Sequence, residues 1–141
     1  MITIVGLILF LIFMFLSMMH FYWSFGGKNG MDAMVPQRAD GTNLFNPGFF
    51  ASIFVALGLL SFALYVLIKI NLLNIHLPDW ILKYGLMAIS IIFILRGIGD
   101  FRYVGFFARA NSSQFTKMDK KYYSPLCLLI GFLSLTIELL Q

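Results

Sequence analysis

Four long apolar segments constrain this sequence more than any other feature. Their approximate bounds are 2–25, 48–70, 80–100 and 124–140. An α-helix rises about 1.5 Å per residue, so segments of this length can cross the roughly 30 Å of hydrocarbon in a bilayer. In hydrocarbon the backbone has to satisfy its own hydrogen bonds, which favours helices. The sequence therefore predicts an all-α, integral membrane four-helix bundle that forms a single transmembrane domain over residues 1–141.

The composition supports this class. Hydrophobic residues make up 60% of the chain and charged residues 11%, and the mean hydropathy is +0.90. These values exclude an ordinary soluble domain. No Lys or Arg precedes the first segment and no small-x-small cleavage pattern follows it, so we expect it to remain in the mature protein. The last segment is the shortest, and we expect it to stand nearly upright in the membrane.

Basic residues are unevenly distributed, and their distribution predicts the orientation. The first and third loops contain seven of them: Lys28, Arg38, Arg102, Arg109, Lys117, Lys120 and Lys121. Only two, Lys69 and Lys83, lie around the second loop. The positive-inside rule then makes the two longer loops cytoplasmic and both termini extracytoplasmic. Topology and anionic lipids account for the net charge of +4, so no nucleic-acid partner is expected.

Few residues are suited to bind a metal. Cys127 is the only cysteine, which excludes a disulfide within the chain and a thiolate-rich metal site. His20 and His76 fall on opposite sides of the membrane in the predicted topology, so they cannot share an ion. We therefore predict neither a metal nor a cofactor, and expect Cys127 to be a small residue at a helix interface.

The third apolar segment ends in two charged residues, each of which costs about 2.5 to 3.5 kcal/mol inside a bilayer. Arg96 and Asp100 are one helical turn apart, so their side chains can meet on one face. Gly97 and Gly99 beside them would let another helix come close. Two interpretations are open: a polar functional site, or a structural ion pair or arginine that reaches lipid phosphates.

Each predicted helix has one face on which small or polar residues recur every three or four positions. In the third helix this face contains Arg96, so we expect Arg96 to point into the bundle rather than to lipid. Glu138, at the outer end of the fourth helix, is expected to reach water. The faces are Phe10, Phe13, Ser17, His20 and Ser24; Gly48, Ser52 and Ala56; Gly85, Ala88, Ile92, Arg96, Gly99 and Tyr103; and Ser124, Cys127, Gly131, Ser134 and Glu138.

His20 shares its face with Ser17 and Ser24, and three polar residues on a lipid-facing stripe would have no partners. We therefore expect His20 to face the bundle interior, within about 12 Å of the Arg96 guanidinium, a span that one headgroup and a water can bridge. It is either a histidine hydrogen-bonded between helices or a group that transfers protons or contacts a ligand.

Residues 26–46 form a long first loop that is too polar and too rich in glycine to be another span. Either it folds back over the bundle as a binding loop or lid, or it is disordered. Asn46 and Pro47 then form a start signal for the second helix, as Ser124 and Pro125 do for the fourth.

The unusual polar residues gather at the predicted cytoplasmic end, whereas the outer end is sparse. They are His20, Trp23, Asn46, Arg96, Asp100, Tyr103, Asp119 and Tyr122. Cations and hydrogen-bond donors beside an apolar bundle suit an anionic amphiphile such as a lipid or isoprenoid phosphate. Our first hypothesis is a protein that binds or handles such a molecule.

Two other classes of function are open. A membrane-embedded lipid-modifying enzyme would use His20 as acid or base, Asp100 as its counter-charge and Arg96 on the substrate anion. A structural or accessory subunit would use the small-residue stripes to contact a membrane partner protein or, in a homo-oligomer, a second copy. Co-purifying molecules distinguish these classes, because a lipid favours the first two and a protein the third.

Several motifs resemble those of a known family. They are His20-Phe-Tyr-Trp23 with Gly26-Gly27, Phe45-Asn-Pro47, Arg96-Gly-Ile-Gly-Asp-Phe-Arg-Tyr-Val-Gly-Phe-Phe107, and Asp119 followed by Tyr123-Ser-Pro-Leu-Cys127. Over nearly its whole length the chain resembles a family of small bacterial four-helix membrane proteins that is catalogued only as a domain of unknown function. The resemblance implies a topology but no activity.

Overall fold

The computed structural model describes residues 1–30, 35–36, 38, 40, 42–44, 48–99, 104–105, 107 and 114–141. Their regular elements are all helical, in agreement with the predicted class. In chain order they are α1 (Ile2–Ser24), α2 (Phe49–Lys69), α3 (Asp79–Ile98), α4 (Gln114–Met118), the π-helical turn η1 (Asp119–Tyr123) and α5 (Ser124–Leu140). Four stretches are long and apolar enough to cross a membrane: Ile2–Ser24, Phe49–Lys69, Asp79–Ile98 and Phe115–Leu140.

The fourth span begins earlier than predicted. The helical backbone runs without a break from α4 through η1 into α5, so this span has 26 residues. It is therefore long enough to tilt, and the expectation that it stands nearly upright loses its basis. Ser124 and Pro125 are not the start of the helix. Pro125 follows directly after the π-helical turn, where the regular α-helical hydrogen-bond pattern that a proline would break is already altered.

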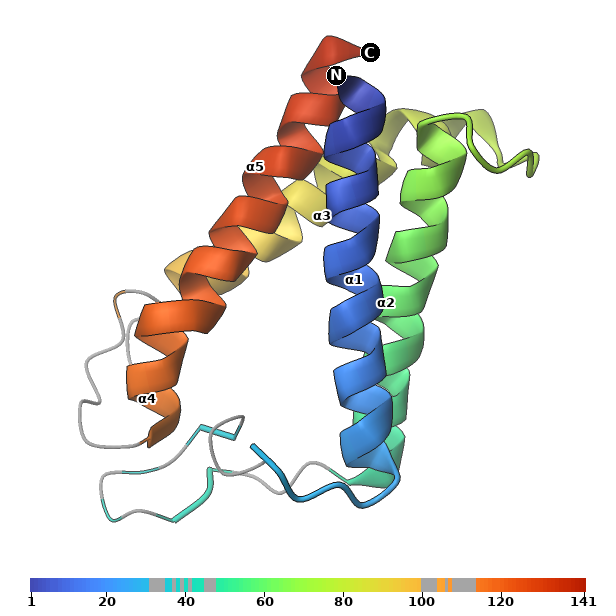
Figure 1. The fold of residues 1–141 in the computed structure, drawn as a ribbon. Helices are drawn as coiled ribbons and strands as arrows, with labels where there is room; N and C mark the ends of the chain where they lie inside the picture. The colour runs from blue at the N-terminus through green and yellow to red at the C-terminus, as the bar shows by residue number, and fades with distance from the viewer. Residues whose placement is uncertain are drawn as a thin grey trace.

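The helices pack as two pairs, α1 with α2 and α3 with α5 (Figure 1). In the first pair the Ser17 hydroxyl donates a 2.8 Å hydrogen bond to the carbonyl of Ala56. In the second the Ser90 hydroxyl donates one of 2.8 Å to the carbonyl of Gly131. A Cβ at Gly97 would lie 2.7 Å from the Leu128 side chain, so a glycine is needed where α3 meets α5. Ser17, Ala56 and Gly131, from the stripes predicted for the first, second and fourth helices, therefore do act in close packing.

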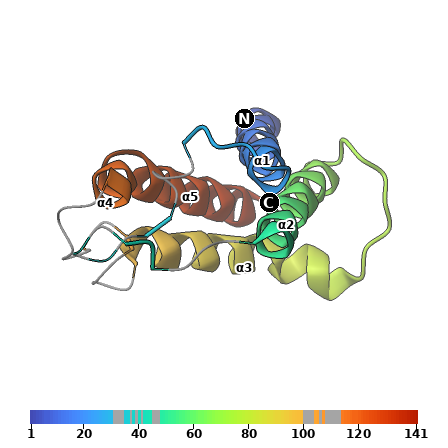
Figure 2. The same ribbon diagram turned by 90° about the horizontal axis from the view of Figure 1, so that it is seen from below.

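The two pairs meet at one end of the molecule and diverge toward the other (Figures 1 and 2). We call the end with Ile2, Lys69, Asp79 and Leu140 the termini-side end. The end with Ser24, Phe49, Ile98 and Gln114 is the loop-side end. The main hydrophobic core lies toward the termini-side end, and it consists of Leu9, Phe13, Leu59, Ala63, Tyr65, Val66, Ile70, Leu86, Ile89, Phe93, Ile130 and Ile137.

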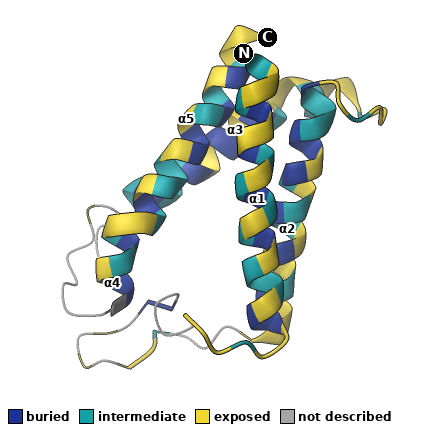
Figure 3. Cartoon of the chain, viewed as in Figure 1, coloured by how far each residue is buried: buried dark blue, intermediate teal, exposed yellow. Residues whose placement is uncertain are grey.

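Large apolar side chains also cover the outer sides of the helices (Figure 3). Phe15, Phe50, Phe54 and Leu95 are all more than 60% exposed. Such a surface is unfavourable in water but suits contact with lipid chains. The four apolar helices and their exposed surface together indicate a multi-pass membrane protein.

The packing face predicted for the third helix is wrong at two of its residues. Ala88 and Ile92 are exposed, Ile92 by 53%, whereas Gly85 does pack, against the Tyr65 side chain of α2. The residues that α3 buries are Leu86, Ile89, Ser90, Phe93 and Gly97. The reason is that α3 crosses α5 where Ser90 and Gly97 meet the neighbourhood of Gly131 and Leu128. The part of the predicted face that carries Ala88 and Ile92 therefore borders the surface.

Candidate functional site

The strongest polar contact at the loop-side end joins Arg96 to Asp119. The Nη2 of Arg96 lies 3.1 Å from Oδ1 of Asp119, in an ion pair that is also a hydrogen bond. Arg96 comes from the last turn of α3 and Asp119 from the first residue of η1. Both belong to the predicted site. The expected partner of Arg96, Asp100, lies outside the described residues, so its place in the predicted pair is untested.

Asp119 is fully buried and accepts three described hydrogen bonds. Besides Arg96, the hydroxyl of Ser124 donates to Oδ1 at 3.1 Å and the backbone N–H of Gly105 donates to Oδ2 at 2.6 Å. A buried carboxylate is costly unless it is paired and hydrogen-bonded, and these donors meet that need. Asp119 thus ties α3, the segment after α3 and the start of the fourth span to one point.

Two glycines make the contact with Asp119 possible. Gly99 and Gly105 have positive φ angles of 84° and 97°, a region that L residues other than glycine rarely adopt. Their backbones also touch, since a Cβ on Gly105 would lie 2.3 Å from Cα of Gly99. Gly99 therefore serves the close approach of its own backbone to that of Gly105, whereas Gly97 serves the helix packing that the sequence predicted for both residues.

The Arg96 side chain is 34% exposed, although its partner is fully buried. Its Nη1 atom is buried and has no hydrogen-bond acceptor among the described residues. The guanidinium is thus anchored at one nitrogen and incompletely satisfied at another, because a guanidinium carries five N–H donors. Three further cations come from the same turns of the fourth span, namely Lys117, Lys120 and Lys121.

His20 and Trp23 form a second contact at the loop-side end, on α1. Their rings meet edge to face, with centroids 5.2 Å apart. His20 is half-buried, and its Nδ1 donates to the carbonyl of Leu16 at 2.8 Å. Trp23 is buried and donates from Nε1 to the carbonyl of Asn29 at 2.9 Å. In the described part of the chain, no hydrogen bond, ion pair or ring contact joins this pair to Arg96, and the predicted closeness of His20 to Arg96 stays a prediction.

Other residues of the predicted site are placed differently. Tyr122 is exposed, and the ammonium of Lys121 lies 5.1 Å from its ring centre. Tyr103 and Asn46 lie outside the described residues. Cys127 is half-buried within the α3–α5 pair, which fits the expected role at a helix interface. Among the described residues, no group of three His, Cys, Asp or Glu side chains is arranged to hold a metal ion.

The described parts of the first loop combine two buried residues with local hydrogen bonds, although Arg38, Asp40, Thr42 and Asn43 are exposed. Val35 and Pro36 are buried, and the N–H of Leu44 donates to the carbonyl of Pro36 at 2.7 Å. The hydroxyl and N–H of Thr42 donate to Asp40 at 2.6 and 2.9 Å, which lowers the pKa of the Asp40 carboxyl below its usual value. These contacts favour the predicted fold-back over predicted disorder for this part of the loop.

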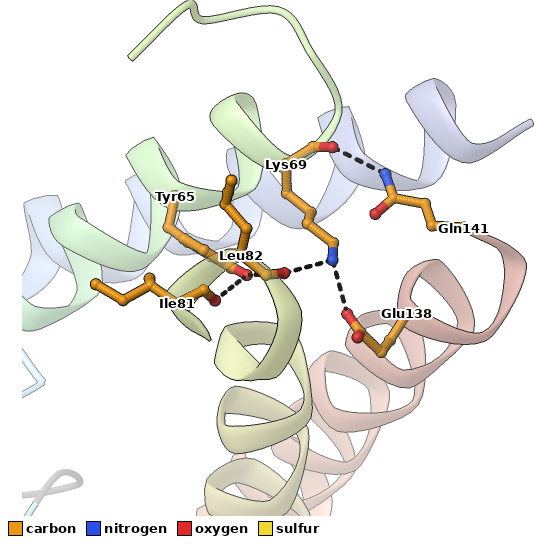
Figure 4. Close-up of polar contacts among 6 residues, drawn as sticks. All are labelled: Tyr65, Lys69, Ile81, Leu82, Glu138 and Gln141. Carbon is orange, nitrogen blue, oxygen red and sulfur yellow. Dashed lines mark hydrogen bonds and ion pairs between the residues drawn. The ribbon is translucent and has the colours of Figure 1, made fainter. Parts of the chain in front are cut away.

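A polar cluster that the sequence did not reveal lies at the termini-side end (Figure 4). The Nζ of Lys69 is 3.1 Å from Oε2 of Glu138 and donates to the carbonyl of Leu82 at 2.6 Å. The side chains of Lys69 and Glu138 are only 12% and 15% exposed, so the expectation that Glu138 simply reaches water is wrong. The 3.1 Å contact lacks hydrogen-bond geometry at Oε2, and the attraction is mainly that of opposite charges.

Two further side chains complete this termini-side cluster. The Tyr65 hydroxyl lies 3.1 Å from the carbonyl of Ile81 and 3.3 Å from that of Leu82, and the Gln141 amide donates to the carbonyl of Lys69 at 2.8 Å. A pocket of about 390 Å³ next to it is lined by Lys69, Leu82 and His76, among others. The termini-side end, which the sequence predicted to be the outer one, is therefore not sparse in polar contacts. Spacing alone could not have paired Lys69 with Glu138 across 69 residues.

Comparisons with known proteins identify a family but no activity. No curated protein and no solved structure matches the chain. A family described as a protein of unknown function, DUF3995, matches residues 13–134. This match includes the second half of α1, all of α2 and α3, and most of the fourth span, with both Arg96 and Asp119. The chain therefore belongs to the DUF3995 family.

Proposed function

We propose that this protein binds an anionic amphiphile, such as a lipid with a phosphate headgroup, at its loop-side end. The observation that carries the proposal is the position of Arg96. Its side chain is 34% exposed, its Nη1 atom is buried without an acceptor among the described residues, and it stands at the end of the exposed apolar face of α3 that carries Ala88 and Ile92. An acyl chain on that face would place its headgroup at the guanidinium.

The local charge suits an anion. Among the described residues of this end, Arg96, Lys117 and Lys121 are opposed by the carboxylate of Asp119 within their segments. Asp119 already accepts three hydrogen bonds, and its one negative charge cannot neutralise all three cations. Arginine and phosphate also form strong, geometrically specific hydrogen bonds. A phospholipid with a net negative charge therefore fits this end better than a zwitterionic or neutral lipid.

The distribution of basic residues supports a cytoplasmic position for the loop-side end, with both termini outside. Single cysteines in a Cys127→Ser background test this orientation. A cysteine introduced beside Lys120 should be protected from a membrane-impermeant thiol reagent in intact cells and react once the cells are opened. A cysteine at Ile75, in the exposed 70–78 connection, should react in both cases. The reverse pattern would place the two long loops outside.

Lipid retention tests the binding proposal. The protein is purified into nanodiscs of phosphatidylcholine that contain one tenth phosphatidylglycerol, and the lipids retained after release are counted by native mass spectrometry. The wild-type chain should retain phosphatidylglycerol above its share of the bilayer. Arg96→Gln should lower this preference by about tenfold, the loss expected for one charge-assisted contact. Lys83→Gln, at the other end of α3, is the matched control and should retain it.

A second variant separates binding from stability. Arg96→Lys keeps the charge beside Asp119 but loses the planar donor pair, so it should fold and bind anionic lipid more weakly than the wild type. Equal retention of phosphatidylglycerol by wild type, Arg96→Gln and Arg96→Lys would refute the proposal. A stoichiometric protein instead of a lipid would favour an accessory subunit.

A proton-transfer role for His20, as in a lipid-modifying enzyme, is a second candidate that one observation favours. The carbonyl of Leu16 can only accept, so Nδ1 of His20 carries a proton and Nε2 is left as the basic nitrogen of the neutral ring. His20→Gln keeps hydrogen bonding but cannot take up a proton. Turnover of a co-purified lipid by the wild type and its loss in His20→Gln would support an enzyme, whereas turnover by both would exclude His20 as the proton-transfer group.

A further inference from the structure

The pocket at the termini-side end lies where two spans meet the connection that joins them. Its lining comes from Ile68 and Lys69 at the end of α2, from the 70–78 connection, and from Asp79 and Leu82 at the start of α3. Because one span ends at Lys69 and the next begins at Asp79, the pocket lies at the level of the lipid headgroups. Ligand pockets have volumes of about 300 to 1,000 Å³, and this one has about 390 Å³. It therefore suits a molecule of headgroup size.

Backbone hydrogen bonds give the connection a defined shape. The N–H groups of Leu72 and Leu73 both donate to the carbonyl of Leu67, at 2.9 and 3.1 Å. The N–H of Asn71 donates to the carbonyl of Ile68 at 3.0 Å. Asn71 has a positive φ of 59°, which asparagine adopts more readily than most residues. The wall of the pocket is thus formed before a ligand arrives, which reduces the entropy that binding has to remove.

The lining of the pocket includes charges of both signs. The Nζ of Lys69 donates to the carbonyl of Leu82 and lies beside the carboxylate of Glu138 (Figure 4). A lysine ammonium has three N–H donors, so these two described contacts leave one donor for a ligand. Asp79 is exposed and belongs to neither of the described ion pairs. A cation and a carboxylate that can both contact a ligand therefore line the same pocket.

The charge balance of this end distinguishes it from the loop-side end, where cations are in excess. The charged side chains described at the termini-side end are two cations and two carboxylates, namely Lys69, Lys83, Asp79 and Glu138. A ligand with both a positive and a negative group matches such a balance better than an anion does. We propose that this pocket binds a zwitterion that carries an amine and a phosphate, the chemistry shared by the phosphatidylethanolamine headgroup and its water-soluble counterparts.

The types of the lining residues assign a role to each part of the ligand. The carboxylate of Asp79 accepts hydrogen bonds from the ligand ammonium, and Lys69 donates to the phosphate. The side-chain amides of Asn71 and Asn74, which also line the pocket, donate to the remaining phosphate oxygens. A choline headgroup has no N–H donor for Asp79. The pocket therefore prefers phosphatidylethanolamine to phosphatidylcholine.

Lipid retention tests this preference. The full chain is purified into nanodiscs of phosphatidylcholine that contain one tenth phosphatidylethanolamine, and the retained lipids are counted by native mass spectrometry. The wild type should retain phosphatidylethanolamine above its share of the bilayer. Asp79→Asn keeps the size of the side chain but removes its charge, so it should lower the preference by about tenfold, the loss expected for one charge-assisted hydrogen bond. Asp40→Asn, which removes an exposed carboxylate of the first loop, is the matched control and should keep the preference.

A second measurement distinguishes a membrane lipid from a ligand that comes from water. Nanodiscs of phosphatidylcholine alone are titrated with glycerophosphoethanolamine, the soluble headgroup, and bound molecules are counted in the same way. Binding of this probe to the wild type and its loss in Asp79→Asn would identify a water-soluble zwitterion as a ligand. Retention of phosphatidylethanolamine without binding of the probe would identify the membrane lipid.

Two results would overturn the proposal. One is a wild type that retains phosphatidylethanolamine only at its bilayer share and does not bind the soluble probe. The other is the same preference in the wild type and in Asp79→Asn. If Asp79→Asn fails to fold, Asn71→Gly decides the question, because glycine adopts the positive φ of this position and removes only the amide. It should lower the preference by about threefold, as the loss of one neutral hydrogen bond does, and an unchanged preference would refute the assignment.

Discussion

The two described ion pairs lie at opposite ends of the molecule and join different kinds of neighbours. Arg96 and Asp119 connect α3 to the start of the fourth span within one helix pair. Lys69 and Glu138 connect α2 to α5, from one pair to the other. The carboxylate of the first is fully buried and has three donors, although Arg96 is 34% exposed, whereas Lys69 and Glu138 are 12% and 15% exposed and Oε2 of Glu138 accepts no hydrogen bond from the described residues. The comparison shows that an ion pair can either join helices within one helix pair or join the two helix pairs to each other.

The largest expected loss of stability follows from Asp119→Leu. It leaves the Arg96 guanidinium without its carboxylate and the Gly105 N–H without its acceptor. Loss of one partner of a buried ion pair costs about 3 to 5 kcal/mol. The free energy of unfolding in mixed micelles, titrated with sodium dodecyl sulfate, measures the loss. Asp119→Leu combined with Arg96→Leu should lose less than the sum of the two single variants, and additive losses would show that the residues act separately.

Lys69→Met should cost less, about 2 kcal/mol, because it removes one ion pair and the hydrogen bond to Leu82, whereas Asp119→Leu removes an ion pair and three hydrogen bonds. The same titration measures it, with Lys83→Met as the variant that should stay close to the wild type. A loss as large as that of Asp119→Leu would contradict the distinction between a carboxylate held by three hydrogen bonds and one held mainly by charge.

Gly97→Ala tests the packing of α3 against α5 within one helix pair. Its new methyl group would lie 2.7 Å from two atoms of Leu128 and 3.2 Å from the carbonyl of Ser124. Overpacking of this kind costs about 1 to 3 kcal/mol. Gly58→Ala is the matched control on α2, because nothing lies within 4 Å of its Cβ position, and it should be neutral or stabilising by up to about 1 kcal/mol. Similar changes in both variants would rule out a packing effect.

Ser17→Ala should have the smallest effect, about 0.5 to 1 kcal/mol, from the lost hydrogen bond to Ala56 of α2. Ser61→Ala removes a hydroxyl that bonds the carbonyl of Leu57 in its own helix and is exposed, so no contact between helices is lost. Unfolding of both variants should show a loss only for Ser17→Ala. A loss of the same size at Ser61 would mean that Ser17 contributes through its own helix.

The fold was predictable because length and hydropathy are local properties of the sequence. Four apolar segments are enough to predict four helices, and the helices begin and end within a few residues of the prediction except at the fourth span. That error arose at Pro125, which usually marks a helix start but here follows a π-helical turn. Local signals cannot distinguish a helix start from an altered hydrogen-bond register.

The polar contacts were less predictable, because their partners are distant in the sequence. Arg96 and Asp119 were both predicted to be site residues, but their direct pairing over 23 residues was not. The orientation of α3 was misjudged because Ser90 and Gly97, rather than Gly85 and Ala88, make the contact with α5. Lys69 and Glu138 were treated as end groups, since neither has a charged neighbour one helical turn away.

The π-helical turn at Asp119–Tyr123 has a consequence for how the fourth span can tolerate changes in length. Each residue of an α-helix advances the side-chain direction by about 100°, and a π-helical turn contains one residue more than an α-helical turn. Phe115, Thr116 and Asp119 before or within the turn and Ser124 and Ile130 after it are all buried. Deletion of a single residue inside the turn would restore a regular helix. It would also rotate the buried residues before the turn relative to those after it, so that the two groups no longer face the same side. The extra residue in the π-helical turn therefore adjusts the direction of the side chains that follow it. One continuous helix can then bury residues both before and after the turn.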